Sequence, residues 1–343
     1  MSYILVTGGA GYIGSHTVLE LLAKGYQVSV VDNLSNSSTA SLQRVEKLSG
    51  KKVNLHQFDV QDTTALDKLL TSEQFDAVIH FAAFKAVDES VTDPLKYYRN
   101  NVGAFMGLLQ SLRSHGVNKI VFSSTAAIYG TPAVERVTEE TPANPESPYG
   151  WSKYMDELIL RDVCQADRNF QAIVLRYFNA VGAHESGQLG ESPAGKPANL
   201  LPVLIQSLSG KLPPLVVNGN DYSTKDGTCE RDYIHVMDLA QAHVTALEKL
   251  EAKSNQNYHV YNIGTGKPTS VLELIKSFET VNNIQVPYSI GPRRPGDPVA
   301  FFAAPDKARK ELGWQATKTI EDAVRDAWNW HLQNPDGYTM EVL

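Results

Sequence analysis

A glycine-rich turn after the first apolar run constrains the fold of this 343-residue chain more than any other feature. The run YILVT at 3–7 has the β-branched, apolar character of a buried strand, and the turn places Gly8, Gly11 and Gly14 between this run and a helical pattern. Glycines at such a junction let the backbone turn tightly and approach a pyrophosphate, while the N–H groups at the helix N-terminus bind the anion. The turn therefore predicts a strand–helix unit that binds a dinucleotide.

Strand-like and helix-like segments alternate through the first half of the chain. Because the strand-like runs are apolar throughout, they predict a parallel sheet covered by helices on both faces, which is the α/β doubly wound architecture. The candidate strands are 3–7, 27–31, 53–58, 77–81, 119–123 and 172–176.

The character of the sequence changes after about residue 180. Long loops rich in Gly, Pro, Ser and Asn alternate there with helical runs, and loops of this length are usually functional. We expect a nucleotide-binding domain over 1–180 and a smaller α/β substrate domain over 181–343, with a strand near 259–264 that returns to the first sheet.

An acidic residue follows the second predicted strand. Asp32 lies 18 residues after Gly14, where a carboxylate can accept hydrogen bonds from the adenosine ribose and would repel a 2′-phosphate. No Arg or Lys follows until Arg44, so NAD is favoured over NADP. The alternative is that Asp32 only caps the turn over DNLSNSS.

Two further loops follow predicted strands and are candidates for contacts with the same cofactor. Asp59 comes after the third strand, where it would meet the adenine. After the fourth strand, the small residues Ala82 and Ala83 would let the cofactor pass, and Lys85 would reach a phosphate or a ribose. The alternative for Lys85 is a solvated surface lysine.

A tyrosine and a lysine lie one helical turn apart in SPYGWSKYM. Ser147 suits the N-cap and Pro148 the first helical position, so Tyr149 and Lys153 would share one helix face. An ammonium near a phenol favours the phenolate, so we expect a lowered pKa for Tyr149 and a role as base near neutral pH. The alternative is a coincidental surface pair, although none of the other 14 of the chain's 15 tyrosines has a lysine four places on.

The fifth predicted strand ends in hydroxyl side chains, in KIVFSSTAAIYG. Ligands of parallel sheets bind at the carboxyl ends of the strands, so we expect Ser123 and Ser124 to line the cofactor side and Thr125 to touch the substrate. Ala126 and Ala127 follow, and neither can give or take a proton.

Composition excludes several classes of function. The net charge of −7 argues against binding to the polyanionic surfaces of nucleic acids or membranes, and no apolar run approaches the ~20 residues of a spanning helix. The two cysteines and nine histidines show no metal-ligand spacing, so we expect no metal, and His80 is interpreted as a core histidine. The first residues enter a strand directly, which leaves no room for a signal peptide and favours a cytoplasmic location.

The pair Tyr149 and Lys153, with Thr125 upstream, resembles the catalytic set of the short-chain dehydrogenase/reductase superfamily. The longer motifs TGGAGYIGSH, FAAFKAVDESV, LRYFNAVGAH, GNDYSTKDGTCERDYIHVMDLA and RRPGD are similar, nearly end to end, to the UDP-galactose 4-epimerase family. This resemblance implies a Rossmann domain, a smaller sugar-nucleotide domain and a homodimer. It also implies that Tyr149 takes the proton of the sugar 4-hydroxyl while C4 gives hydride to NAD, and that the 4-keto sugar then turns over.

The same resemblance implies roles for individual residues. Thr125 would bond the reacting sugar oxygen, and Lys153 would also hold the nicotinamide ribose. Besides the residues already named, the implied cofactor contacts are Tyr12, Ile13, Asn33, Asn36, Ser37, Val60, Phe81, Asn100, Ser123, Tyr177 and Phe178.

The implied substrate site lies in the second half of the chain. Arg231 and Arg294 are candidates for the diphosphate, because a guanidinium matches phosphate oxygens, although each could instead pair with a neighbouring acid such as Asp232 or Asp297. Asn199 would cap a helix that points at the same anion, and the bulk of Phe301 would disfavour an N-acetyl group at C2. The remaining implied substrate contacts are Thr125, Asn179, Leu200, Val216, Val217, Asn218, Tyr233 and Asp297, with Lys85 and Tyr149 shared with the cofactor site.

Two other functions are compatible with the first motifs. Related dehydratases carry Asp-Glu directly after this threonine and decarboxylases place a Glu nearby, whereas this chain has Ala126 and Ala127. A nucleotide sensor without activity is the second alternative, since fold does not fix function. Such a protein would often have lost the tyrosine or the lysine.

Overall fold

The computed structural model of the chain describes residues 2–193, 195, 197, 199–252, 256–294 and 296–338. The chain forms two compact units, and each is built from segments that are separated in the sequence. The first unit comprises Met1–Gly130, Pro142–Tyr177 and Ala240–Tyr261, and the second comprises Thr131–Thr141, Phe178–Leu239 and Asn262–Leu343. The segments 131–141 and 240–257 therefore lie on the opposite side of the boundary expected near residue 180, whereas the strand expected near 259–264 joins the first sheet as predicted, as β11 Tyr258–Ile263.

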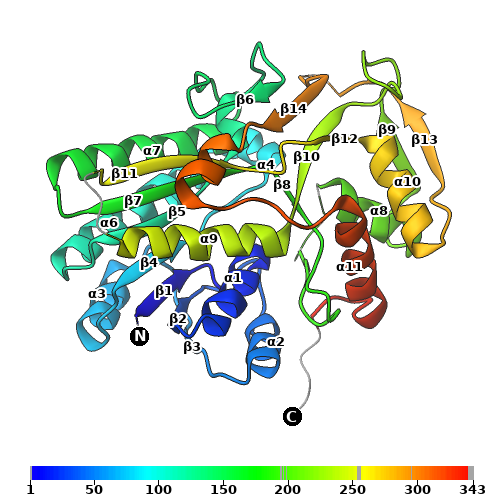
Figure 1. Cartoon of the computed structure of the whole chain (residues 1–343). Coiled ribbons are helices and arrows are strands. Elements are labelled where there is room, and N and C mark those ends of the chain that lie inside the picture. The colour runs from blue at the N-terminus through cyan, green and yellow to red at the C-terminus, as the bar shows by residue number, and fades with distance from the viewer. Residues whose placement is uncertain are drawn as a thin grey trace. The chain divides into compact units, whose positions relative to one another are not determined.

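The first unit contains a seven-stranded sheet with the order β11-β7-β5-β4-β1-β2-β3 (Figure 1). The neighbouring pairs β1/β2, β1/β4, β2/β3, β4/β5 and β5/β7 are parallel, so the expected doubly wound α/β fold is confirmed. Strand order reverses between β1 and β4, which is the place where such sheets bind ligands. The strands are β1 Tyr3–Thr7, β2 Gln27–Val31, β3 Asn54–His56, β4 Ala77–His80, β5 Lys119–Thr125, β7 Gln171–Tyr177 and β11 Tyr258–Ile263.

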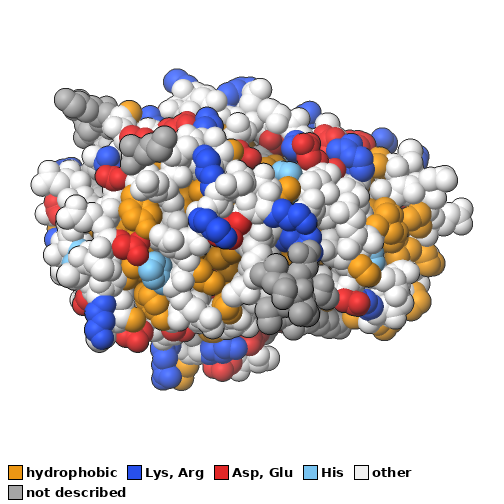
Figure 2. All heavy atoms as spheres, turned by 90° about the horizontal axis from the view of Figure 1, so that it is seen from below, with side chains coloured by type: hydrophobic (Ala, Val, Ile, Leu, Met, Phe, Trp, Pro, Cys, Tyr) orange, Lys and Arg blue, Asp and Glu red, His pale blue; other side chains and the backbone are white. Residues whose placement is uncertain are grey.

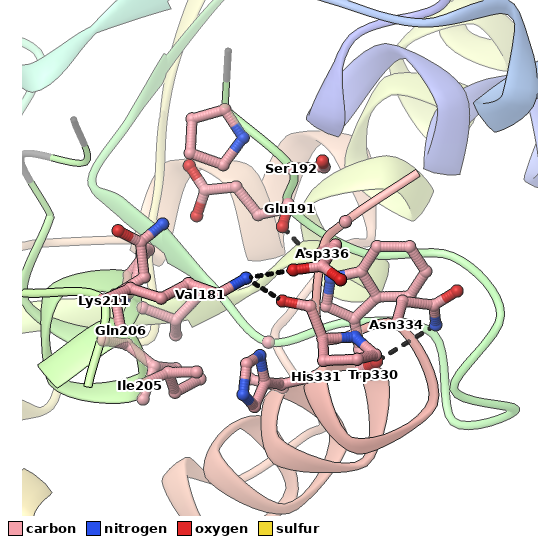
Figure 3. A pocket seen from close by; sticks show the side chains of 17 residues that line it. Val181, Glu191, Ser192, Ile205, Gln206, Lys211, Trp330, His331, Asn334 and Asp336 are labelled. Atoms are coloured by element: carbon pink, nitrogen blue, oxygen red, sulfur yellow. Dashed lines mark hydrogen bonds and ion pairs between the residues drawn. The ribbon is translucent and has the colours of Figure 1, made fainter. Parts of the chain in front are cut away.

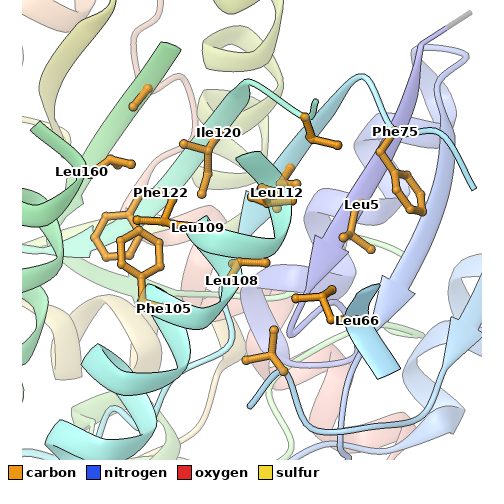
Figure 4. Close-up of a cluster of buried hydrophobic side chains, with 14 of the residues drawn as sticks. Leu5, Leu66, Phe75, Phe105, Leu108, Leu109, Leu112, Ile120, Phe122 and Leu160 are labelled. Carbon is orange, nitrogen blue, oxygen red and sulfur yellow. The ribbon is translucent and has the colours of Figure 1, made fainter. Parts of the chain in front are cut away.

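Helices flank this sheet and bury a large apolar cluster against it. Figure 4 shows Phe105, Leu108 and Leu112 of α6 packed with Ile120 and Phe122 of β5, and all five side chains are buried. The helices that belong wholly or mainly to this unit are α1 Tyr12–Ala23, α2 Thr39–Ser49, α3 Thr63–Ser72, α4 Val87–Thr92, α5 Pro94–Tyr97, the π-helix η1 Tyr98–Gly103, α6 Ala104–Ser114, the 3₁₀ turn η2 Ala126–Tyr129, α7 Pro148–Ala166 and α9 Val236–Glu251.

The second unit has smaller sheets and its own core. One sheet has the order β12-β10-β14-β6, with β8 paired to β10, and β13 pairs with β9. Its core lies between α8, α10 and α11 and includes Leu204, Phe278 and Val324. The elements are β6 Arg136–Val137, β8 Asn179–Val181, α8 Leu200–Leu208, β9 Leu215–Asn218, β10 Glu230–His235, β12 Pro268–Ser270, α10 Val271–Asn282, β13 Tyr288–Gly291, β14 Ala300–Ala303, the π-helix η3 Ala308–Leu312 and α11 Ile320–Gln333.

The surface is mixed in charge where Figure 2 shows it. Lys and Arg side chains lie interspersed with Asp and Glu on that face. Within the part of the chain that the structure describes, none of the helices combines the length and the apolar character needed to cross a membrane.

Candidate functional site

The glycine turn has the backbone geometry that the sequence predicts. Gly8 has φ +71°, and a Cβ atom there would lie 2.7 Å from the backbone nitrogen of Ala82. A Cβ atom on Gly14 would overlap the carbonyl oxygen of Gly8. Helix α1 begins at Tyr12, and its N-cap residue Gly11 makes no side-chain capping bond, so the N-terminus of this helix can face an anion.

Asp32 lies at the carboxyl end of β2 and organises the turn that follows. Its Oδ2 accepts from the backbone N–H of Ala10 at 3.0 Å. Its Oδ1 accepts from the N–H of Leu34 at 2.9 Å and from Oγ of Ser37 at 2.8 Å. The turn-capping alternative is thus a real part of its role, and contact with a ribose remains a prediction.

The other candidates for cofactor binding in this unit follow the ends of β1 to β4, or lie in the π-helix. Asn33 donates from Nδ2 to Asp59 at 2.8 Å, which ties the loop after β2 to the loop after β3. Val60 is buried in the apolar core, so it would meet a cofactor only through its backbone. The candidates with exposed or half-buried side chains are Tyr12, Ile13, Asn33, Asn36, Ser37, Asp59, Phe81, Ala82, Ala83, Lys85 and Asn100.

The hydroxyls at the end of β5 point to different partners. Ser123 hydrogen-bonds the phenol of Tyr177, in keeping with a shared place in the site. Ser124 was expected on the cofactor side, and this is wrong, because its buried hydroxyl donates to Glu157. Thr125 accepts from the N–H of Ala127 at 3.1 Å through its side chain.

Helix α7 brings the tyrosine and the lysine to the end of β5. Ser147 is its N-cap, as predicted, and accepts from the N–H of Gly150 at 3.1 Å. The phenol of Tyr149 lies close enough to Thr125 for that hydroxyl to influence its pKa. Lys153 is buried and donates from Nζ to the carbonyl oxygen of Ser123 at 2.9 Å. The coincidental surface pair is therefore excluded.

The expected lowering of the pKa of Tyr149 is wrong for the chain alone. Burial raises this pKa because it disfavours the phenolate, and the nearby hydroxyl of Thr125 offsets only part of the effect. Burial also lowers the pKa of Lys153 to about 8, against the pull of Asp156 and Glu157. The phenol becomes a base near neutral pH only if a further positive charge lies beside it.

The candidate substrate residues other than Lys85, Thr125 and Tyr149 lie in the second unit. Arg231 forms an ion pair with Asp297, with 3.0 Å between Nη2 and Oδ1, and also donates to the carbonyl oxygen of Pro298 at 3.0 Å. The ion-pair alternative is thus realised for Arg231, with Asp297 as its partner rather than Asp232. The side chain of Arg294 is exposed.

Asn199 stands at the N-cap position of α8, but its side chain makes no capping bond, so the predicted side-chain cap is wrong. Its carbonyl oxygen accepts from the N–H of Val203 instead. Asn179 donates from Nδ2 to the carbonyl oxygen of Asp232 at 3.2 Å.

The remaining substrate candidates form two groups in the second unit. The rings of Phe178 and Phe301 lie 5.2 Å apart, so Phe178, a candidate cofactor contact, packs on the residue expected to restrict C2. Leu200 begins α8, Tyr233 is half-buried on β10, and β9 supplies Val216, Val217 and Asn218, of which Val217 is buried.

Comparison with known proteins adds a second line of argument. A family model described as GDP-mannose 4,6 dehydratase matches residues 5–327. UDP-glucose 4-epimerase of Bacillus subtilis is 50% identical over 335 residues, which are 98% of each chain. UDP-glucose 4-epimerase 2 of Oryza sativa is 52% identical over 338 residues, which are 98% of this chain and 83% of the rice protein. The chain belongs to the UDP-glucose 4-epimerase family.

Solved structures of this epimerase family agree in fold. The enzyme of Bifidobacterium longum, solved in complex with NAD+ and UDP, is 49% identical, covers 98% of this chain and 100% of its own, and has a TM-score of 0.93. The enzyme of Stenotrophomonas maltophila, solved with NAD and formylated UDP-arabinopyranose, is 41% identical, covers 98% and 99%, and has a TM-score of 0.95.

Sequence reasoning missed one residue that organises the site of this epimerase-family chain. Asn101, on the π-helix η1, accepts from the N–H of Phe84 at 2.9 Å and donates to its carbonyl oxygen at 3.1 Å. Its Nδ2 also donates to Oγ of Ser152 at 2.9 Å, and Ser152 donates to the carbonyl oxygen of Tyr149 at 2.8 Å. Asn101 therefore links the loop that carries Lys85 to the start of α7.

The second unit contains a cavity of about 130 Å³ (Figure 3). Its lining comes mainly from α8, α11 and the turn after α11, and Lys211 donates there to Asp336 at 2.7 Å. None of the candidate residues of the epimerase family lines this cavity, so we do not assign the reaction to it.

Proposed function

We propose that this chain is an NAD-dependent epimerase that interconverts UDP-glucose and UDP-galactose at C4. The observation that carries the proposal is the meeting of Thr125, Tyr149 and Lys153 at the carboxyl end of β5, where buried Lys153, one turn after Tyr149 on α7, donates to the carbonyl oxygen of Ser123. This arrangement supports transfer of a proton from a sugar hydroxyl to a phenolate. The similarity to epimerases solved with NAD and UDP ligands supports the choice of cofactor and substrate.

The roles of the chain's own residues follow from their contacts. NAD, when bound, accepts the hydride of C4 and returns it to the other face of the sugar. Tyr149 holds the proton of the 4-hydroxyl in between, and Thr125 orients that phenol and the sugar oxygen. The cation of Lys153 stabilises the phenolate, because an opposite charge nearby favours the ionised form.

NAD and the UDP-sugar are bound by different kinds of protein groups. We assign the pyrophosphate of NAD to the glycine turn and to the N-terminus of α1. We assign the diphosphate of the UDP-sugar to Arg231 and Arg294, and Asp297 fixes the guanidinium of the first. Because the protein binds the nucleotide part of the substrate firmly, the sugar can rotate to present its other face.

The description of the matching family model raises the alternative of a dehydratase. Elimination of water needs an acid and a base at C5 and C6 in addition to oxidation at C4. Thr125 is followed here by Ala126 and Ala127 in η2, and neither side chain can transfer a proton. The proposal is therefore epimerisation.

Product analysis of the purified protein tests this function. We expect NAD to be released on denaturation, and UDP-galactose to give UDP-glucose without added oxidant. Tyr149→Phe should lower kcat by at least about 10²-fold, because it removes the proton-transfer group. Tyr154→Phe, on the same helix, should leave kcat unchanged. A 4-keto-6-deoxy product, or full activity in Tyr149→Phe, would refute the proposal.

We further propose a homodimer that acts in the cytoplasm. The apolar side chains of Val87, Val91, Leu95, Trp151 and Met155 are exposed on α4, α5 and α7, and α7 packs against both other helices. A cluster of exposed apolar residues is typical of an interface.

Sedimentation velocity tests the oligomeric state. Leu95→Glu should give monomers, whereas Leu332→Glu, at another exposed leucine, on α11, should leave the dimer intact. A monomeric parent protein would contradict the dimer.

A further inference from the structure

Four ionisable side chains are buried on α7 and on the strand β7 that packs against it. Lys153, Asp156 and Glu157 lie on α7 and Arg176 on β7, with exposed fractions of 3%, 1%, 2% and 7%. Arg176 holds both carboxylate oxygens of Glu157, with 2.6 Å from Nη2 to Oε2 and 3.0 Å from Nε to Oε1. These two charges cancel in one ion pair, which leaves Lys153 and Asp156 as the remaining buried base and acid.

Within the part of the chain that the structure describes, Asp156 lacks a hydrogen bond that would stabilise a buried carboxylate at one of its oxygens. Oδ1 is buried and has no hydrogen-bond partner among the described residues. A buried carboxylate is costly unless a cation or hydrogen bonds compensate it. Asp156 follows Lys153 by three residues, a spacing that makes two helical side chains neighbours. Lys153 is therefore the cation closest to it along the helix.

The elements packed against α7 offer no competing buried cation in the described part of the chain. Arg176 is buried but committed to Glu157, and His80 on β4 stays neutral because burial and the charge of Lys153 lower its pKa. The ionisable side chains on α4, α5, η1, η2, β5 and β7 are Asp88, Glu89, Lys96, Tyr97, Tyr98, Arg99, Lys119, Tyr129, Arg176 and Tyr177.

We propose that Asp156 is a positioning residue whose carboxylate keeps Lys153 positively charged beside Tyr149. Its catalytic consequence rests on the proposed function, since Asp156 acts only through Lys153. Two opposing effects support the pairing. Burial lowers the pKa of Lys153 and raises that of Asp156, and the charge of each residue opposes the shift of the other.

The pH profile of kcat is the first test. In Asp156→Asn the ammonium of Lys153 loses its counter-charge, so the alkaline limb of the profile should move to lower pH by about one unit. Asp156→Glu should restore most of that shift. Asp162→Asn, an exposed acid on the same helix, should leave the profile unchanged. A loss of kcat in Asp156→Asn that is uniform from pH 6 to 9 would overturn the proposal.

A stability test needs no activity. Lys153→Met leaves the carboxylate of Asp156 buried without its cation, so we expect a lower melting temperature for this variant. The double variant Lys153→Met/Asp156→Asn removes the stranded charge and should recover at least half of that loss. A double variant that melts no higher than Lys153→Met would overturn the pairing. Recovery in the double variant, together with a parent protein that fails to epimerise UDP-sugars, would support the pairing and refute only the proposed function.

Discussion

Replacement of Arg176 by methionine should be among the most destabilising single changes in the first unit. The change removes the ion pair with Glu157 and the hydrogen bond from Nη1 to the phenol of Tyr129 at 2.9 Å. It leaves the carboxylate of Glu157 buried, with only the hydroxyl of Ser124 as a side-chain partner within the described residues. Breaking a buried pair in this way costs about 3–5 kcal/mol, which is two to three and a half decades in the unfolding equilibrium.

Urea unfolding at neutral pH, followed by far-UV circular dichroism, measures this loss. With an m value of about 3 kcal/mol/M, the midpoint should fall by about 1–1.7 M. Arg161→Met is the matched control, since its partner Asp162 is exposed and such pairs contribute about 0–1 kcal/mol.

A double variant separates charge from packing. In Arg176→Met/Glu157→Leu no charge of the pair is left stranded, so stability should rise above that of Arg176→Met, because apolar replacements of buried pairs are often neutral. The reasoning fails if Arg176→Met shifts the midpoint no more than the Arg161 control does, or if the double variant is less stable than the single one.

Four further predictions address the cofactor, the specificity and the core. Asp32→Asn should cut NAD retention by about tenfold or more, because hydrogen bonds to a charged acceptor are worth about 1.5–3 kcal/mol, and full retention would reject the ribose assignment. Phe301→Ala should raise turnover of UDP-N-acetylglucosamine relative to UDP-glucose, and an unchanged ratio would remove this residue as the limit at C2. Gly14→Ala drives a methyl group into a carbonyl oxygen of the same turn and should cost about 1–3 kcal/mol as well as NAD binding, whereas Gly103→Ala, whose nearest atom lies 3.8 Å away, should be neutral or stabilising in thermal melts. Burial lowers the pKa of His80 in the folded state, so only the unfolded state gains its proton, and stability should fall as pH drops through about 6.5 by up to about 1.4 kcal/mol per pH unit. Urea midpoints between pH 7.5 and 5.5 should show this slope, and His80→Gln should flatten it.

Local patterns predicted the framework of the molecule well. The strands at Tyr3–Thr7 and Gln27–Val31 and the cap at Ser147 follow from residues adjacent in sequence, because apolar runs, glycine turns and capping side chains act over a few positions. The third strand is shorter than its apolar run, Asn54–His56 rather than 53–58, since only these residues pair with β2.

Features that depend on contacts between residues far apart in the chain could not be predicted from the sequence. Arg231 and Asp297 are 66 positions apart, so nothing local chooses between an ion pair and a free diphosphate ligand. The π-helix at Tyr98–Gly103 carries Asn101 to Phe84 and Ser152, although its sequence continues the helical pattern of its neighbours. The pKa of Tyr149 was misjudged because spacing reveals the lysine four positions on, whereas burial is set by the whole fold.

The interleaving of the two units has a consequence for biosynthesis. The seven-stranded sheet of the first unit is complete only when β11, Tyr258–Ile263, lies beside β7, which ends at Tyr177. About 80 residues must therefore leave the ribosome after β7 before the edge of that sheet is filled, a delay of about 4–16 s at 5–20 residues per second. During that interval β7 presents an open edge, which is where nascent strands of other chains pair. The order of synthesis thus exposes the nascent chain to misassembly at β7. A fragment that ends near residue 180 would leave the edge of β7 unpaired permanently.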